Sequence, residues 1–205
     1  MRRWLLLLLL CATALAQPQP TGLVELITLE PGLKLDVHYA RKDNFMGRVL
    51  YPEARAFLQQ PAAEALVRAH RSLAKQGYGI VVFDGYRPWR ITKLMYDESP
   101  PEWRGVYVAD PKDGSRHNRG CAVDCSLYVL KTGKQVVMPS GYDDFTEKAH
   151  ADYKGGTSEQ RHLRGVLRKA MEAQGFRVLP EEWWHFDYRD WKKYPVLDVE
   201  FSAVK

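Results

Sequence analysis

Residues 115–124 read S-R-H-N-R-G-C-A-V-D and place a histidine seven positions before an aspartate. In a straight strand, residues seven apart face opposite ways, because side chains alternate between the two faces. His117 and Asp124 can share a site only if the backbone bends between them, and Gly120 can supply that bend. The sequence therefore predicts a turn that leads into a strand over residues 121–127.

A second stretch, E-W-W-H at residues 182–185, supplies another histidine and an acid. Together the two stretches offer His117, Asp124 and His185 as ligands of one Zn²⁺, because two imidazoles and a carboxylate suit this ion. Three protein ligands leave a fourth position open for water, as in catalytic zinc sites, and zinc lowers the pKa of that water to about 7. Glu182 is then the expected base, provided that a bulge among the tryptophans turns it toward His185.

The surrounding sequence predicts both helices and strands. One helix begins at Pro61 and ends at Gly77; another follows the capping box formed by Thr157 and Gln160. Short runs of alternating or β-branched residues predict strands at residues 23–28, 35–39, 79–83, 121–127, 176–179 and 181–188. No repeat, linker or change in composition divides these elements, so the sequence predicts a single domain with mixed helix and strand.

Some candidate ligands are better explained as structural residues. Cys121 and Cys125 lie about 13 Å apart on an extended strand, whereas a disulfide needs Cα atoms about 4.4–6.8 Å apart. We therefore expect two buried thiols on the core face of the strand. His38 is expected to be half-buried in a strand, and His70 to be a surface or cap-side residue of the helix.

The N-terminus resembles a secretory signal peptide. Arg2 and Arg3 precede an apolar run, and Ala14-Leu15-Ala16 forms a small-residue cleavage site. The run is too short for an ordinary transmembrane helix. We expect a signal peptide at residues 1–16, a mature domain at residues 17–205, and an exported protein that is periplasmic or secreted without a stable membrane anchor. A lipoprotein site at Cys11 is disfavoured because Leu10 is not small.

Size and charge indicate a single domain and disfavour one class of partner, nucleic acids. The chain has 205 residues, 45% of them hydrophobic, which is enough for one domain with a real core. Its net charge of +5 falls to +3 after loss of the two arginines in the signal peptide, since 28 basic and 25 acidic residues remain. The basic residues are spread along the chain instead of clustered, which argues against a nucleic-acid partner.

Two further motifs complete a recognisable set: D-G-Y-R-P at residues 84–88 and Y-D-D-F at residues 142–145. With S-x-H-x-x-G-x-A-x-D and E-x-W-H, in this order, the chain resembles the D-alanyl-D-alanine dipeptidases, zinc peptidases of the vancomycin-resistance type. It is similar, more loosely, to the wider group of zinc D,D-carboxypeptidases and peptidoglycan endopeptidases. The resemblance implies an α+β fold in which an antiparallel sheet carries one zinc ion per chain and helices flank it.

The resemblance also assigns roles. Pro88 favours an extended Arg87, and the residues alone leave open whether this arginine forms a structural salt bridge with Asp84 or acts in the site. The resemblance implies that Arg87 stabilises the oxyanion that develops during hydrolysis. It also identifies Glu182, not Glu181, as the base.

The same family uses a carboxylate after the metal motif to hold the free ammonium of its substrate. Asp143 is the matching position, although Asp144 lies next to it, and Ser115 matches a hydroxyl that contributes to the same contact. A carboxylate there disfavours N-blocked peptides, which would leave its charge unpaired.

The expected reaction is zinc-dependent hydrolysis of D-alanyl-D-alanine, or of a close D-amino dipeptide. One alternative is a D,D-carboxypeptidase or endopeptidase that acts on cell-wall peptides; many of those enzymes carry aspartate at the position of Glu182. Another is a wall-binding module without turnover, which the presence of Glu182 and Arg87 disfavours because binding needs neither.

Overall fold

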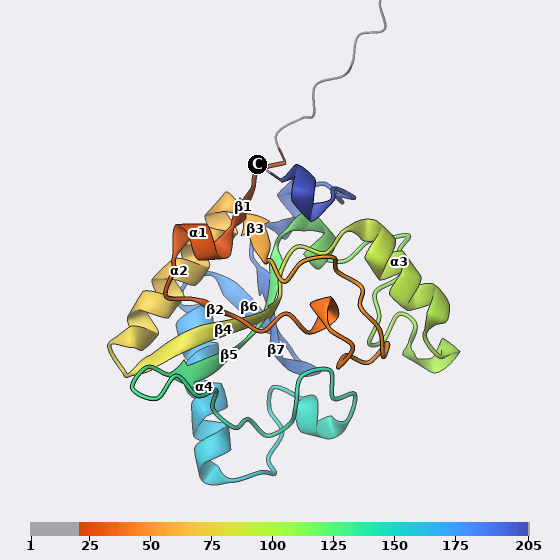
Figure 1. Ribbon diagram of the computed structural model, residues 1–205. Coiled ribbons are helices and arrows are strands. Elements are labelled where there is room, and N and C mark those ends of the chain that lie inside the picture. Colours follow the sequence, from red (N-terminus) through yellow and green to blue (C-terminus); the bar gives the residue numbers. More distant parts are fainter. Residues whose placement is uncertain (1–20, 205) are drawn as a thin grey trace, which may run out of the picture.

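The computed structural model describes residues 21–204, and its centre is a five-stranded sheet with the order β2-β4-β5-β7-β6 (Figure 1). The strands are β2 (Lys34–Leu35), β4 (Tyr78–Asp84), β5 (Ala122–Val129), β6 (Phe176–Leu179) and β7 (Glu182–Tyr188). Four of them form antiparallel pairs, and β2 adds to β4 in parallel. The expected α+β architecture is confirmed, with one parallel pair at the sheet edge that the antiparallel expectation did not include.

Helices lie on both sides of this sheet. The two long helices, α2 (Gln60–Ala74) and α4 (Ser158–Glu172), pack on one face, whereas α3 (Trp89–Glu98) lies on the other side (Figure 1). A short helix α1 (Leu26–Leu29) and a two-stranded sheet of β1 (Leu23–Glu25) and β3 (Phe57–Gln59) complete the fold. Both long helices begin as predicted, α2 with proline in its first turn and α4 with the capping box.

The main core fills the space between the sheet and the two long helices. Residues opposite each other in an antiparallel pair share a face, and the register pairs Ile80 with Leu127 and Val82 with Cys125. All four are fully buried. The helices bury an apolar stripe against them that includes Leu66 and Leu167. The opposite face of the sheet is therefore free to carry polar residues.

Leu66 is expected to be a major contributor to stability. It is fully buried on α2 in the main core, so Leu66→Ala should lower the free energy of unfolding by about 2–5 kcal/mol through lost burial and an unfilled cavity. Glu64→Ala, on the exposed side of the same helix, should change it by less than about 0.5 kcal/mol. Denaturant unfolding of both variants measures this difference. Equal effects would contradict the packing of α2.

Two strand predictions near the N-terminus are wrong in part. Residues 23–28 form only the short β1, after which the chain turns into α1. Leu26 is the only buried residue of α1, and its carbonyl accepts a hydrogen bond from the amide of Glu30. Residues 35–39 leave β2 after one residue and form a 3-10 turn, His38–Ala40. Alternation of apolar residues indicated strands, but neither segment has a partner strand along its full length.

The histidine and cysteine expectations have mixed outcomes. Cys121 and Cys125 are free and buried, as predicted. His38 is half-buried, although in the 3-10 turn instead of a strand. The prediction that His70 lies on the surface is wrong, because it is only 5% exposed and its Nδ1 accepts a hydrogen bond from the amide of Ile80. It therefore ties α2 to the start of β4.

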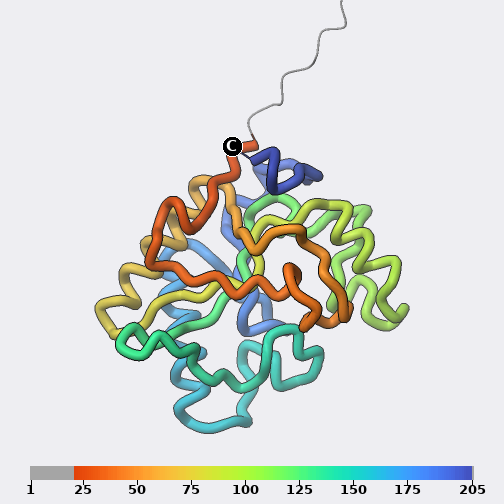
Figure 2. Tube along the Cα trace, in the orientation of Figure 1, coloured from red at the N-terminus to blue at the C-terminus, as the bar shows by residue number. Residues whose placement is uncertain are grey.

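Loops cover the polar face of the sheet. Phe145 contacts Phe45 at 5.4 Å and Trp103 at 4.8 Å between ring centroids. These contacts bring together loops from three distant parts of the sequence (Figure 2). The segment that carries Phe145 is therefore one of the loops that cover this face.

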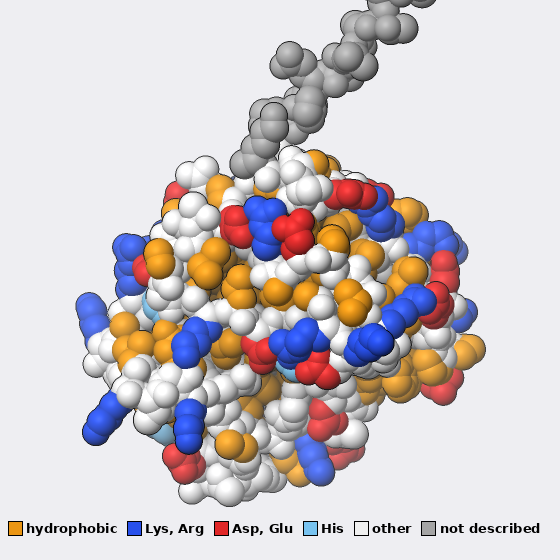
Figure 3. Space-filling view, in the orientation of Figure 1, with side chains coloured by type: hydrophobic (Ala, Val, Ile, Leu, Met, Phe, Trp, Pro, Cys, Tyr) orange, Lys and Arg blue, Asp and Glu red, His pale blue; other side chains and the backbone are white. Residues whose placement is uncertain are grey.

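The expected signal peptide, residues 1–16, lies outside the described residues. Among residues 21–204, no helix has the length and apolar character needed to cross a membrane. Acidic and basic side chains are interspersed on the face shown in Figure 3. This agrees with the even spread of charge along the sequence.

Candidate metal centre

Sheet register explains why distant residues meet. Asp124 on β5 and His185 on β7 are direct partners across the antiparallel pair, so their side chains lie next to each other on the polar face. His117 begins a short 3-10 turn that ends at Gly120, whose φ of 66° is left-handed. This glycine turns the chain into β5 and brings His117 to the other two, as the sequence predicted.

The three side chains form a compact, buried group that could hold a metal ion. Nε2 of His117 lies 3.1 Å from Nδ1 of His185 and 3.4 Å from Oδ1 of Asp124, and the last two atoms are 2.9 Å apart. A tetrahedral ion with bonds of about 2.0–2.1 Å holds its ligand atoms about 3.4 Å apart. The donor set therefore fits zinc with shifts of only a few tenths of an ångström.

Outer hydrogen bonds fix the orientation of each ligand. Nδ1 of His117 donates to the carbonyl of Gly85 at 2.7 Å, and Nε2 of His185 donates to Asp187 at 3.0 Å. Since those nitrogens carry the protons, the opposite nitrogens offer lone pairs to a metal. The Tyr142 hydroxyl donates to the second oxygen of Asp124 at 3.0 Å.

Sequence reasoning missed these outer partners. Asp187 could have been found, because it follows His185 by two positions and so shares its face of the strand. The carbonyl of Gly85 and the hydroxyl of Tyr142 carry no such signal, since only the fold brings them to the site.

The charge state of Asp124 suits a metal ligand. Burial alone would raise the pKa of this carboxyl, but the imidazoles of His117 and His185 oppose it and hold the pKa well below its usual range. The carboxylate therefore stays ionised while buried.

Asp187 is expected to support metal binding without touching the ion. Asp187→Ala should lower metal affinity by about 10- to 100-fold, because His185 loses the acceptor that fixes its ring. Asp190→Ala is a matched control, since Asp190 pairs with Lys193 outside the site. Competition of each variant with a chromophoric zinc chelator measures the affinity. Unchanged affinity for Asp187→Ala would contradict the assigned role.

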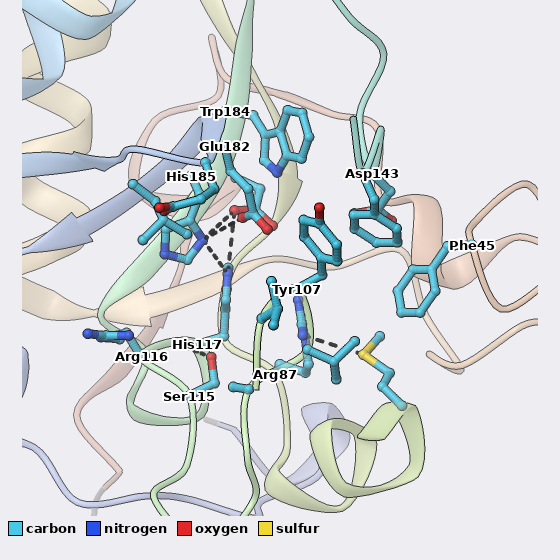
Figure 4. Close-up of a pocket in the computed structure, with 18 of the residues that line it drawn as sticks. Phe45, Arg87, Tyr107, Ser115, Arg116, His117, Asp143, Glu182, Trp184 and His185 are labelled. Atoms are coloured by element: carbon cyan, nitrogen blue, oxygen red, sulfur yellow. Dashed lines mark hydrogen bonds and ion pairs between the residues drawn. The ribbon is translucent and has the colours of Figure 1, made fainter. Parts of the chain in front are cut away.

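Glu182 reaches the metal group through the expected bulge. Val178 pairs with Phe186 but Leu179 pairs with Glu182, so β7 contains extra residues between these two positions. Oε2 of Glu182 lies 3.7 Å from Nδ1 of His185 (Figure 4). Burial raises the pKa of Glu182 to about 7. This value suits a group that takes and returns a proton near neutral pH.

The three residues next to Glu182 in the sequence lie in different surroundings. Glu181 is exposed at the rim of the pocket, Trp183 is in the core, and Trp184 forms part of the pocket wall. Trp184 therefore forms the wall of the pocket on the β7 side, and Trp183 packs against it from the core.

Arg87 forms the salt bridge with Asp84 and also lines the pocket, so its position is compatible with both of the roles that the sequence left open. Its Nε and one terminal nitrogen donate to the same oxygen of Asp84 at 3.0 and 2.7 Å, so the salt bridge exists. The guanidinium also lines the pocket, 5.0 Å from the ring centroid of Tyr39. Asp84 is 1% exposed and accepts two further hydrogen bonds, from Tyr51 and the amide of Gly85. The salt bridge thus holds the arginine in place at the pocket.

The structure separates the two adjacent aspartates. Asp143 lines the pocket with a left-handed φ of 56°, and the Tyr39 hydroxyl donates to its carboxylate at 3.2 Å. Asp144 instead accepts hydrogen bonds from Thr146 within its own turn. Burial, followed by the charges of Asp124 and Glu182, raises the pKa of Asp143 well above its ordinary value. A cation in the pocket would stabilise the ionised form.

Ser115 also lies at this pocket, although its hydroxyl has a local partner. The residue is buried, and its Oγ accepts a hydrogen bond from the amide of His117 at 3.1 Å. The hydroxyl proton remains available to a ligand.

These residues surround a cavity of about 280 Å³. Small-molecule sites are typically about 300–1,000 Å³, so this cavity is slightly smaller than that range. Its polar side carries the metal group, and its apolar side includes Phe45, Val106, Tyr107 and Phe145. The arrangement suits a small, partly apolar molecule with charged ends.

Comparisons with known proteins agree with this geometry. A family model described as D-ala-D-ala dipeptidase matches residues 19–204. The D-alanyl-D-alanine dipeptidase of Escherichia coli (strain K12) is 32% identical over 183 residues, which cover 89% of this chain and 93% of that relative. The D-alanyl-D-alanine dipeptidase of Enterococcus faecium is 35% identical over 189 residues, covering 84% and 93%.

Among solved structures, a vancomycin resistance D,D-dipeptidase in complex with a D-Ala-D-Ala phosphinate analog is similar at a TM-score of 0.45 and 22% identity. The match covers 67% of this chain and 53% of that chain.

Proposed function

Because the chain belongs to the D-Ala-D-Ala dipeptidase family of peptidases, we propose that it hydrolyses D-alanyl-D-alanine, or a closely related D-amino dipeptide, to free amino acids. The observation that carries this proposal is the convergence of His117, Asp124 and His185, with Glu182 beside them, at a small pocket. These three ligands would hold one zinc ion. When bound, zinc would supply a Lewis acid that polarises the scissile carbonyl and lowers the pKa of water.

Glu182 is the proton carrier in this proposal. It takes a proton from the attacking water and returns it to the amine that leaves, which requires a pKa near the working pH. The position of its carboxylate, 3.7 Å from a metal-facing nitrogen, places it within reach of a water molecule in the site.

Arg87 would stabilise negative charge on the scissile oxygen as the tetrahedral intermediate forms. Its charge is fixed in place by Asp84, so little reorganisation is needed when the oxyanion develops. A single donor of this kind is worth about 2.7–4 kcal/mol in barrier height.

Asp143, with Ser115, would bind the free ammonium of the dipeptide. The carboxylate is partly buried and accepts a hydrogen bond from the hydroxyl of Tyr39. A substrate ammonium would compensate its charge, whereas a blocked N-terminus would not. This requirement, with the small cavity, favours dipeptides over wall polymers.

Asp143→Asn tests this contact. The loss of a charged hydrogen bond of about 1.5–3 kcal/mol should lower kcat/KM for D-Ala-D-Ala by about 10- to 100-fold, mainly through KM. Asp144→Asn is the matched control and should keep kinetics close to those of the unmodified chain. Steady-state measurement of alanine release provides both values. An unchanged KM in Asp143→Asn would contradict the assignment.

We also infer that the protein is exported and works in the periplasm or outside the cell. The support is the pattern of residues 1–16, with two arginines, an apolar run and Ala14-Leu15-Ala16. Mass spectrometry of the protein recovered after expression of the full chain should find a mature form that begins at Gln17. Recovery of only the uncleaved chain would contradict export.

The test of function compares three substrates. The zinc-loaded mature protein is incubated with free D-Ala-D-Ala, with a wall pentapeptide ending in D-Ala-D-Ala, and with peptidoglycan. Alanine release from the dipeptide alone supports the proposal. Release only from the pentapeptide would identify a D,D-carboxypeptidase, and binding to peptidoglycan without turnover would identify a wall-binding module.

A further inference from the structure

A dipeptide at neutral pH carries a cation at one end and an anion at the other. The proposed function gives its ammonium a partner, Asp143, but leaves its terminal carboxylate without one. Two of the described residues that line the pocket carry a fixed positive charge, Arg87 and Arg116. One of these two is therefore expected to meet the carboxylate.

Arg87 is already assigned to the developing oxyanion in the proposed function, and Asp84 anchors its guanidinium in that place. Two of its nitrogens bind Asp84, which is 1% exposed, and its remaining terminal nitrogen lies 3.4 Å from the sulfur of Met95. Moving this guanidinium to a second carboxylate would leave Asp84 as an unpaired buried charge.

Arg116 is held much more loosely. Its side chain is 44% exposed, and its Nε lies 3.5 Å from Asp187, too far for a good hydrogen bond. The guanidinium is 4.8 Å from the ring centroid of Trp191, a contact that uses none of its N–H donors, and the residue lines the pocket. At least the terminal donors of the guanidinium remain available for a bidentate bond to a carboxylate.

The position of Arg116 also fits an extended dipeptide. Arg116 and Asp143 lie on opposite sides of His117 in Figure 4. A substrate whose ammonium is at Asp143 and whose scissile carbonyl is at the metal ligands would direct its terminal carboxylate away from Asp143, toward the Arg116 side.

We propose that Arg116 binds the C-terminal carboxylate of the substrate and so restricts the enzyme to peptides with a free carboxyl end. This inference rests on the proposed function and adds the group that selects that end of the substrate. The alternative is a purely structural role, in which Arg116 only holds Asp187 against His185. The structural role would affect zinc binding, whereas carboxylate binding would not.

The experiment measures kcat and KM for D-Ala-D-Ala and for D-alanyl-D-alaninamide, which lacks the terminal charge. In Arg116→Gln, kcat/KM for the free dipeptide should fall by about 10- to 100-fold through KM, while the value for the amide stays unchanged. Zinc content should remain that of the parent, and Arg116→Lys should restore part of the loss. Arg177→Gln is the charge control, since Arg177 is exposed on β6 opposite Asp187 and does not line the pocket.

Three results would overturn the inference: equal losses for both substrates, no loss for either, or a loss of zinc in Arg116→Gln. If that variant fails to fold, the kinetics of the parent protein still test the inference. Equal kcat/KM values of the parent for the dipeptide and the amide would exclude recognition of the carboxylate. Failure of the parent to cleave either substrate while it cleaves a wall pentapeptide would instead contradict the proposed function.

Discussion

Glu182→Gln should retain zinc and lose about 10²- to 10⁴-fold in kcat, the contribution typical of a positioned acid–base group. Glutamine preserves the shape of the side chain but cannot take a proton from water. Because Glu182 is not one of the three ligands, the ion should remain bound. Steady-state kinetics and metal analysis of the same sample measure both properties.

The matched control for this prediction is Glu181→Gln, one position earlier in the chain. Glu181 is exposed, whereas the side chain of Glu182 is only 14% exposed and faces the metal ligands. The control should keep kcat close to that of the parent protein. A fully active Glu182→Gln, or an inactive Glu181→Gln with an intact fold, would show that the base has been assigned wrongly.

His117→Ala should lose both zinc and turnover. Two ligands from adjacent strands would remain. The loss of zinc affinity should exceed the roughly 10- to 100-fold that is typical of removing a residue that only hydrogen-bonds to a ligand. The fold should survive, because His117 lies in a 3-10 turn outside the main core. Metal analysis after dialysis, together with circular dichroism, separates loss of the ion from loss of structure.

His162→Ala controls for removal of an imidazole, since His162 is exposed on α4. It should keep both zinc and activity. Retention of stoichiometric zinc by His117→Ala would contradict the proposed ligand set, even if activity were lost.

The sequence predicted the metal group because local rules determine most of its geometry. Alternation along a strand requires a bend between His117 and Asp124, and Gly120 is the residue that allows it. The spacing of Glu182 and His185 likewise requires a bulge, which the register of β6 and β7 contains. In both cases the number of residues between the two side chains requires an irregularity in the backbone before they can face the same site.

Other features depend on tertiary contacts that spacing does not encode. α3 was not predicted, because only Thr92 and Met95 on it are buried and its apolar pattern is correspondingly weak. His70 was misplaced because its partner, the amide of Ile80, belongs to the next element. The sequence places Asp143 and Asp144 side by side, and only the left-handed turn at Asp143 decides which one faces the pocket.

The most direct test of the account is the zinc content of the purified mature protein, measured by mass spectrometry of metals against protein concentration. One zinc ion per chain is expected after loading and dialysis, and a zinc content close to zero is expected for His117→Ala. A folded parent protein that retains no stoichiometric metal under these conditions would contradict this expectation.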